Sequence, residues 1–85
     1  MQSSHLPLSE QALSELPMGV EATIKAVVAD AAFLRRLHAL GFKSGKSVCV
    51  VRRAAFNGPM QVRLTSTDVM IRPEDARHIQ VQSAN

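Results

Sequence analysis

Turn signals divide this sequence into apolar runs that are too short for long helices or a large parallel sheet. The glycines, Gly19, Gly41, Gly45 and Gly58, all fall where a turn is expected. In residues 21–28 and 60–65, apolar residues alternate with polar ones, which is typical of a strand with one buried face. Further strands are expected at 47–54, which is rich in valine, and at 69–71 and 79–82. Five short strands favour a small barrel, because a flat sheet of this size leaves two open edges.

One helix is expected over residues about 31–40, with short helical turns near 9–16 and 73–77. Asp30 is a good N-cap, and Gly41 is placed to end the helix in a left-handed conformation. The apolar stripe of this helix is Phe33, Leu34, Leu37 and Leu40. The residues therefore predict a mainly β fold, a small, partly open barrel capped by the helix.

The same patterns predict which side chains are buried and where the chain turns. Ala22, Ile24, Ala26 and Val28 are expected to share the buried face of their strand. The segment Asn57-Gly58-Pro59 predicts a turn that closes a hairpin, and Ser66-Thr67-Asp68 predicts another. Residues 1–12 are expected to be a partly disordered lead-in, 13–82 the domain, and 83–85 a frayed tail.

Size and composition limit the classes of function. The 85 residues suit one domain and leave little room for a deep active-site cleft. No apolar stretch approaches the ~20 residues of a membrane span. A lone cysteine and the lack of a signal-peptide pattern predict a cytoplasmic location. The net charge is +3, with a basic excess in residues 43–85. Such an excess can attract an acidic partner, nucleic acid or an anionic membrane face, and the competing interpretation is a solvated surface. No nucleic-acid partner is expected; the lack of Trp and Tyr, on which bases stack, weakens an interpretation as a single-strand binder.

No pattern in the sequence predicts catalysis, a cofactor or a complete metal site. His38, Glu74 and His78 are weak surface candidates for a metal; the last two are four residues apart, on one face if helical. The competing interpretation is a solvated turn for that pair and a helix-end cation for His38. Cys49, between valines, is interpreted as a small buried side chain. An enzyme that uses Cys49 as its nucleophile is a rival hypothesis.

A protein-binding surface is predicted around the hairpin. Arg52 and Arg53 end a strand, and an apolar loop that contains Phe56 follows them. Aromatic residues and arginine are enriched at interface hot spots, so Arg52, Arg53, Phe56 and Met60 are candidate contacts. Phe56 is either an exposed anchor or a plug that folds back on the barrel. An open barrel edge can also accept a strand, which allows a weak homodimer.

The order of several short motifs resembles the FeoA family. The motifs are Leu13–Gly19, Ala22-Thr23-Ile24, Leu34–Phe42, Ser44-Gly45, Val48-Cys49-Val50, Gly58-Pro59, Val62, Ile71-Arg72, Glu74-Asp75-Ala76 and Ile79-Gln80-Val81. The resemblance covers roughly residues 13–82. It departs from the family at Ser66-Thr67, where similar proteins often have a glycine.

The resemblance implies an SH3-like β-barrel and a non-enzymatic cytoplasmic protein of bacterial ferrous iron uptake. Such a protein acts through protein–protein interaction on the cytoplasmic part of the membrane transporter FeoB, which carries a GTPase domain. The alternative is an SH3-like accessory domain of metal-dependent transcriptional control. A role in reading DNA would then need a partner chain, because no helix-turn-helix accompanies the barrel.

Overall fold

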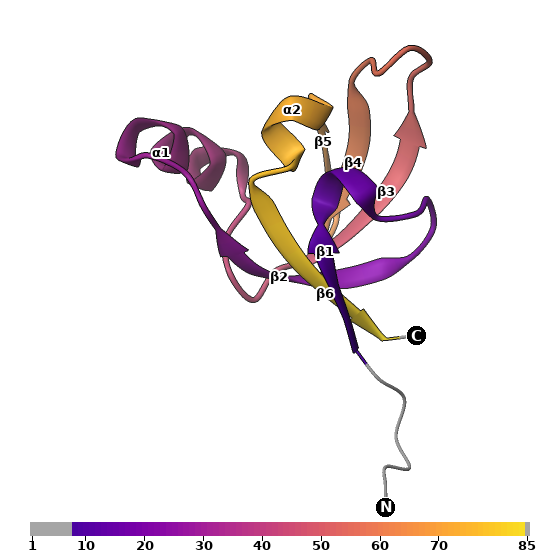
Figure 1. The fold of residues 1–85 in the computed structure, drawn as a ribbon, viewed down its shortest axis with the longest axis horizontal. Helices are drawn as coiled ribbons and strands as arrows, with labels where there is room; N and C mark the ends of the chain where they lie inside the picture. The colour runs from indigo at the N-terminus through magenta and orange to yellow at the C-terminus, as the bar shows by residue number, and fades with distance from the viewer. Residues whose placement is uncertain (1–7, 85) are drawn as a thin grey trace, which may run out of the picture.

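The computed structural model describes residues 8–84, which form one curved antiparallel sheet with helices at its open side (Figure 1). Its elements are β1 (Leu8–Ala12), a 3-10 helix (Leu13–Glu15), β2 (Glu21–Val27), α1 (Ala31–Leu40), β3 (Ser47–Arg53), β4 (Met60–Leu64), β5 (Thr67–Ile71), α2 (Pro73–Ala76) and β6 (Ile79–Ala84). The strand order is β1-β6-β2-β3-β4-β5, so β1 and β5 are the edges of the described sheet. The predicted mainly β, partly open barrel is confirmed, with six strands in place of five.

A single apolar core fills the space inside the curved sheet. It contains Leu13, Leu16, Ala22, Ile24, Leu37, Phe42, Val48, Val50, Met60, Val62, Leu64, Ile71, Ala76, Ile79 and Val81. Each strand from β2 to β6 contributes to this cluster, as do both helices and the 3-10 helix. Burying one large side chain of this kind contributes roughly 1.5–3 kcal/mol, so this cluster is the main source of stability.

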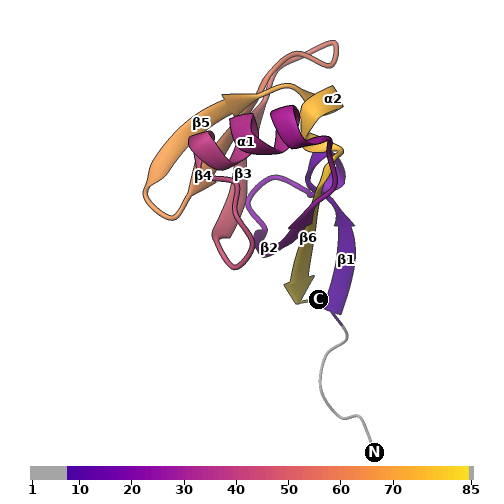
Figure 2. The same ribbon diagram turned by 90° about the vertical axis from the view of Figure 1, so that its left-hand side faces the viewer.

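Helix α1 begins and ends where the sequence predicts, but it buries less of its apolar stripe. The Asp30 carboxylate accepts a hydrogen bond of 2.8 Å from the Phe33 N–H, and Gly41 ends the helix with φ +106°. Of the predicted stripe only Leu37 is buried, and Leu40 is 48% exposed. The helix lies across the open side of the sheet, as Figure 2 shows, so its last turn is not covered.

Both ends of the described chain differ from the prediction. Leu8–Ala12 is a strand paired with β6, and only Leu13–Glu15 of the predicted helical segment 9–16 is helical. Strand β6 continues through Ser83, which is 5% exposed, although this end was expected to fray. Local patterns miss this pairing because the partners are far apart in sequence, as in Glu10 opposite Gln82. The expected disorder of residues 1–7 lies outside the described residues.

A register shift in β2 explains a second correction. The pairing with β6 is irregular between Ile24 and Ala26. A bulge adds one residue and reverses the alternation of faces beyond it. Ala26 and Val28 are therefore exposed, contrary to the prediction, and Val27 packs against the core instead.

The β4–β5 connection is shorter than predicted. Leu64 is paired with Thr67, so only Thr65 and Ser66 form the turn, and Asp68 lies in β5. Thr65 has φ +58°, a left-handed conformation that is unusual for a β-branched residue. The predicted turn at 66–68 was therefore placed one residue too late.

Candidate protein-binding surface

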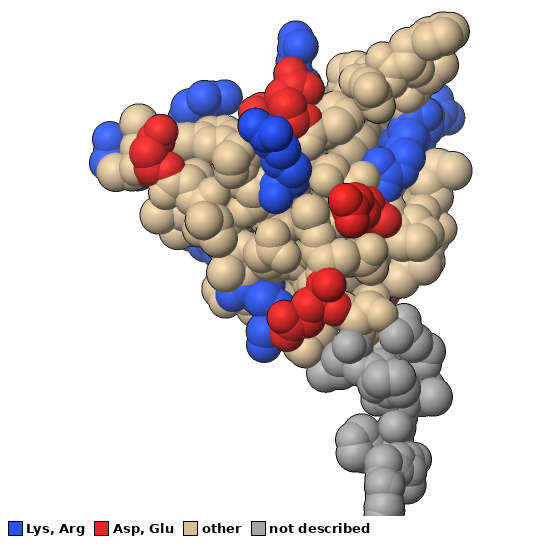
Figure 3. All heavy atoms as spheres, viewed as in Figure 1, with Lys and Arg blue, Asp and Glu red and all other residues tan. Residues whose placement is uncertain are grey.

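The tip of the β3–β4 hairpin projects from the body of the barrel, at the upper right of Figure 1. Phe56 lies in this loop, and its side chain is fully exposed. It therefore does not fold back as a plug. Exposed Ala54, Ala55 and Pro59 surround it, which makes the tip apolar. In Figure 3 the tip is tan, and Lys or Arg side chains lie directly below it.

The turn that presents Phe56 is tight and has unusual backbone angles. The Gly58 N–H donates to the Ala55 carbonyl at 3.1 Å, and the two residues between them, Phe56 and Asn57, have φ values of +58° and +57°. Positive φ at both central positions is the mark of a type I′ turn, which favours Asn or Gly. Phenylalanine in this conformation costs about 1–2 kcal/mol, and such strained residues cluster at functional sites.

Gly58 is required by a close approach within this loop. A Cβ at this position would lie 2.7 Å from the Ala54 Cβ and 3.1 Å from the Ala55 carbonyl oxygen. The Ala54 N–H also donates to the Pro59 carbonyl at 3.1 Å. The loop is therefore closed on itself, which fixes the backbone from which Phe56 projects.

Arg53 joins the base of the hairpin to the segment that follows β1. Its Nη1 donates to the Ser14 carbonyl at 2.9 Å and lies 3.7 Å from the Met60 Sδ, and its Nη2 donates to the Leu16 carbonyl. These contacts occupy most of the guanidinium group. Arg53 thus supports the hairpin from below rather than offering a free charge.

The four candidate contacts therefore take different places. Phe56 and Arg52 are exposed on the same hairpin, Arg53 is half-buried, and Met60 is 0% exposed within the core. The sequence correctly predicted that all four residues belong to one hairpin. It did not predict which side chains face solvent and which ones support the loop.

The metal candidates do not converge. The ring of His78 lies edge-on to Phe33, with centroids 5.2 Å apart, and its Nδ1 is 3.0 Å from the Val28 carbonyl. The Glu74 Oε2 lies 3.9 Å from the Arg72 Nη1. Helix α2 ends at Ala76, so Glu74 and His78 do not share a helix face. His38 is half-buried in the last turn of α1. Within residues 8–84, no three His, Cys, Asp or Glu side chains gather closely enough to hold a metal ion.

Cys49 lies on the outer face of β3, contrary to the interpretation as a core residue. Its neighbours Val48 and Val50 point inward, which leaves Cys49 half-buried on the other face. Its thiol lies 3.9 Å from the Val50 carbonyl, and its partners across the sheet are Arg63 on β4 and Glu21 on β2. The rival hypothesis that Cys49 is a catalytic nucleophile stays a hypothesis.

An ion pair on the outer face of β4 and β5 was missed by sequence reasoning. The Arg63 Nε lies 2.7 Å from one Asp68 oxygen, and its Nη2 lies 3.0 Å from the other. Gln61 donates to the same carboxylate at 2.8 Å. The bond from Arg63 lowers the pKa of Asp68, with a smaller effect from Gln61, and the bond to Asp68 raises the pKa of Arg63. The only sign of this ion pair in the sequence is that Arg63 and Asp68 face each other if a two-residue turn joins their strands.

None of the helices within residues 8–84 has the length and hydrophobicity needed to cross a bilayer.

The family model described as "FeoA domain" matches residues 11–83. Over 70 residues the chain is 37% identical to a Porphyromonas gingivalis protein described as an Fe(2+) transport protein A/Fe(2+) transporter FeoB fusion protein. That alignment covers 82% of this chain and 8% of the fusion protein, so the chain spans a small part of that relative.

Two solved structures share the fold. The first is the FeoA protein of Stenotrophomonas maltophilia, described as a prokaryotic SH3 domain protein and complexed with zinc. It is 32% identical with a TM-score of 0.72, over 86% of this chain and 95% of that one. The second is a manganese-dependent transcriptional repressor, 25% identical with a TM-score of 0.78, over 96% of this chain and 45% of the repressor. The SH3-like character of the barrel is thereby confirmed.

Proposed function

This chain belongs to the FeoA family, and from that premise we propose that it serves ferrous iron uptake as a non-enzymatic module that binds the cytoplasmic part of a FeoB-type transporter. The observation that carries the proposal is the relative in which a similar domain and FeoB are one polypeptide. A covalent link holds two domains at an effective concentration in the millimolar range, which is useful when they act on each other. A separate chain needs an interface to reach the same association.

We place that interface at the tip of the β3–β4 hairpin. Phe56 is fully exposed and is held in a strained turn, and Arg52 is exposed on the same hairpin. An aromatic side chain has few rotatable bonds and so loses little conformational entropy on binding, and an arginine on the same hairpin adds orientation. The matching surface on the transporter would be an apolar pocket with acidic residues at its rim.

The direct test measures binding to the purified cytoplasmic region of the FeoB-type transporter from the same cells. Calorimetry should show that Phe56→Ser weakens binding by about tenfold or more, as expected for a hot-spot aromatic residue. The matched control is Met70→Ser, which removes another exposed apolar side chain, on β5. Lack of binding by the unaltered protein would overturn the proposal. Equal losses in both variants would move the interface away from the hairpin.

The cellular test measures uptake of iron(II) after deletion of the gene, with transporter levels followed in parallel. Lost uptake at a normal transporter level supports direct action on the transporter. Loss of both points to assembly or expression, and unchanged uptake separates this chain from iron transport.

A second candidate function is an accessory domain of metal-dependent transcriptional control, favoured by the likeness to the manganese-dependent repressor. Gel-shift titrations with a partner chain would test it. Binding through phosphate contacts should weaken steeply as the salt concentration rises.

A further inference from the structure

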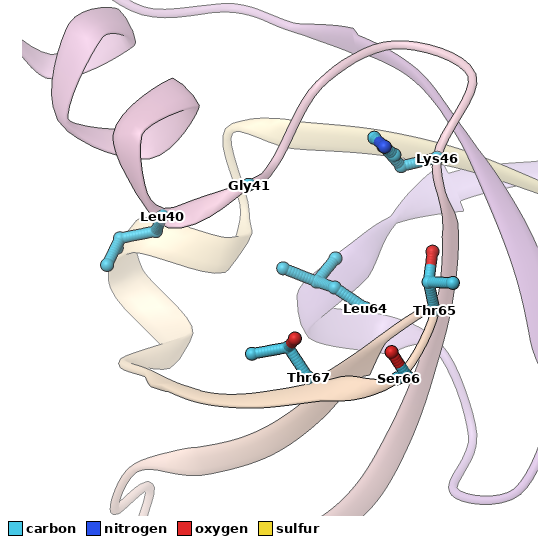
Figure 4. Close-up of a pocket in the computed structure, with 7 residues that line it drawn as sticks. All are labelled: Leu40, Gly41, Lys46, Leu64, Thr65, Ser66 and Thr67. Carbon is cyan, nitrogen blue, oxygen red and sulfur yellow. The ribbon is translucent and has the colours of Figure 1, made fainter.

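A groove on the opposite end of the barrel from the hairpin tip has no place in the proposal above. It lies between the end of α1, the loop 43–46 and the β4–β5 turn, and it encloses about 270 Å³ (Figure 4). Leu64 points into its middle from β4, Leu40 lies at one end and Lys46 lies across from Thr67.

The floor of the groove is apolar and open. Leu64 is 6% exposed at the bottom, and Leu40 is 48% exposed at the end of α1. Gly41 lies between them, and a Cβ there would come within 3.3 Å of the Leu64 Cδ1. The glycine that ends α1 therefore also keeps the floor free, so an aliphatic side chain of a ligand can pack on it.

One wall of the groove is made of hydroxyl groups on a strained turn. Thr65, Ser66 and Thr67 line it from the β4–β5 connection. Thr65 is held with φ +58°, and its N–H donates to the Ser47 carbonyl at 3.3 Å. A β-branched residue is among the least suited to this conformation, and glycine or asparagine would avoid the strain. Strained residues cluster at binding and active sites, which supports a binding role for this wall.

The other side of the groove is basic. Lys46 lines it. Lys43 belongs to the same loop, which is bonded to the backbone of β2 at Ile24 and Lys25. The Gly45 N–H donates to the Ile24 carbonyl at 2.8 Å, and the Ser44 Oγ donates to the Lys25 carbonyl at 2.9 Å. The ion pairs within residues 8–84 are Arg63–Asp68 and Arg72–Glu74, so these lysines have no carboxylate within 4 Å there.

We propose that this groove binds a short acidic segment of a partner protein through one aliphatic side chain. Leu64 and Leu40 take the aliphatic side chain, Lys46 attracts a carboxylate, and the hydroxyls of residues 65–67 bond to the peptide backbone. The carboxylates lie on the lysine side, away from the end of α1, because the dipole of a helix is negative at its C-terminus. Lys46, which lines the groove and has no carboxylate within 4 Å in residues 8–84, is what favours an acidic occupant.

This inference does not depend on the role in iron uptake. The groove and the hairpin tip lie at opposite ends of β3, which begins at Ser47, beside Lys46, and ends at Arg53. A partner bound at one end therefore leaves the other free. Failure at the groove would leave the transporter proposal intact, and the reverse is also true.

The test is an NMR titration of the full-length ¹⁵N-labelled protein with the capped hexapeptide DELLDE. Matched probes are DESSDE, which lacks the aliphatic side chains, and KRLLRK, which reverses the charge. We expect DELLDE to bind with a Kd on the order of 1 mM and to shift the amides of Lys46 and of residues 64–67. DESSDE and KRLLRK should each bind more weakly.

Variants then assign the contacts. Lys46→Glu should weaken the binding of DELLDE by about three- to tenfold, and Leu40→Ser by a similar factor. The control Arg77→Glu makes the same change of charge at an exposed residue that does not line the groove, and it should leave the affinity unchanged. Amide spectra of each variant confirm the fold before titration.

Several outcomes would overturn the proposal. They are a lack of shifts at about 10 mM DELLDE, equal binding of KRLLRK, or shifts confined to the hairpin. Groove amides that move with protein concentration alone would make the occupant a second copy of this chain. Equal shifts with inorganic phosphate would reduce the groove to a site for small anions.

Discussion

Arg63 and Asp68 face each other directly across β4 and β5, and two N–H···O contacts of 2.7 and 3.0 Å join them. The two-residue turn sets this register, because the pair at Leu64 and Thr67 closes the hairpin. The ion pair therefore reports on whether this hairpin is correctly paired.

Stability should depend on pH through this pair. The pKa of Asp68 is lowered in the folded protein by its bond with Arg63. Its stabilising effect is therefore complete above the ordinary aspartate value of about 3.9, and it is lost as the pH falls through the folded pKa. Urea unfolding should show Asp68→Asn to be less stable than the unaltered protein at pH 7, with a smaller difference at pH 3. Arg63→Gln should reduce the same dependence. A difference that is constant with pH would contradict this account.

Arg53→Ala should destabilise the fold by about 1–3 kcal/mol. The change removes the donors to the carbonyls of Ser14 and Leu16, and polar groups left without partners near the core are costly. The neighbouring Arg52→Ala is the control, because Arg52 is exposed, and it should stay within about 0.5 kcal/mol. Urea unfolding measures both free energies. Equal effects would mean that the carbonyls find other partners.

Gly58→Ala should cost about 1–3 kcal/mol through a steric clash in the hairpin loop. The new Cβ would lie 2.7 Å from the Ala54 Cβ. Removing the Ala54 Cβ should therefore relieve part of the clash. In Gly58→Ala with Ala54→Gly, part of the loss should be recovered, although Ala54→Gly alone costs stability. Thermal unfolding of the three variants forms a double-mutant cycle. Additive losses would show that the clash lies elsewhere.

Thr65→Asn should stabilise the protein by about 1 kcal/mol. Asparagine tolerates the left-handed conformation of this residue better than threonine does, and the bond from its N–H to Ser47 remains. Thr67→Asn is the matched control in β5, where threonine suits the extended backbone and the same change should destabilise. Chemical unfolding decides the sign. If Thr65→Asn also destabilises the protein, the threonine side chain makes a contact that stabilises the fold by more than the backbone strain costs.

Much of the fold could be predicted from local sequence signals. Asp30 and Gly41 set the bounds of α1, and the alternation of Met60, Val62 and Leu64 set the buried face of β4. The segment Asn57-Gly58-Pro59 gave the hairpin its place. Each of these signals acts between residues that are close in sequence, so a single chain reveals them.

The errors arose where distant residues decide the structure. Ser9 and Glu10 resemble the start of a helix, but pairing with β6 draws this segment into a strand. The bulge after Ile24 depends on β6 in the same way. At the candidate site, the exposure of Phe56 and the burial of Met60 depend on how the hairpin leaves the barrel. No local pattern carries that information.

The pairing of Leu8 with Ala84 brings the two ends of the described chain to one corner of the molecule. In Figure 1 this corner lies at the bottom, and the β3–β4 hairpin points away from it. A tether attached at either end would thus pull on the same point. With a tether at either end of the described chain, the hairpin would point away from the point of attachment. Swapping a fusion from one terminus to the other should therefore preserve the direction in which the domain is presented.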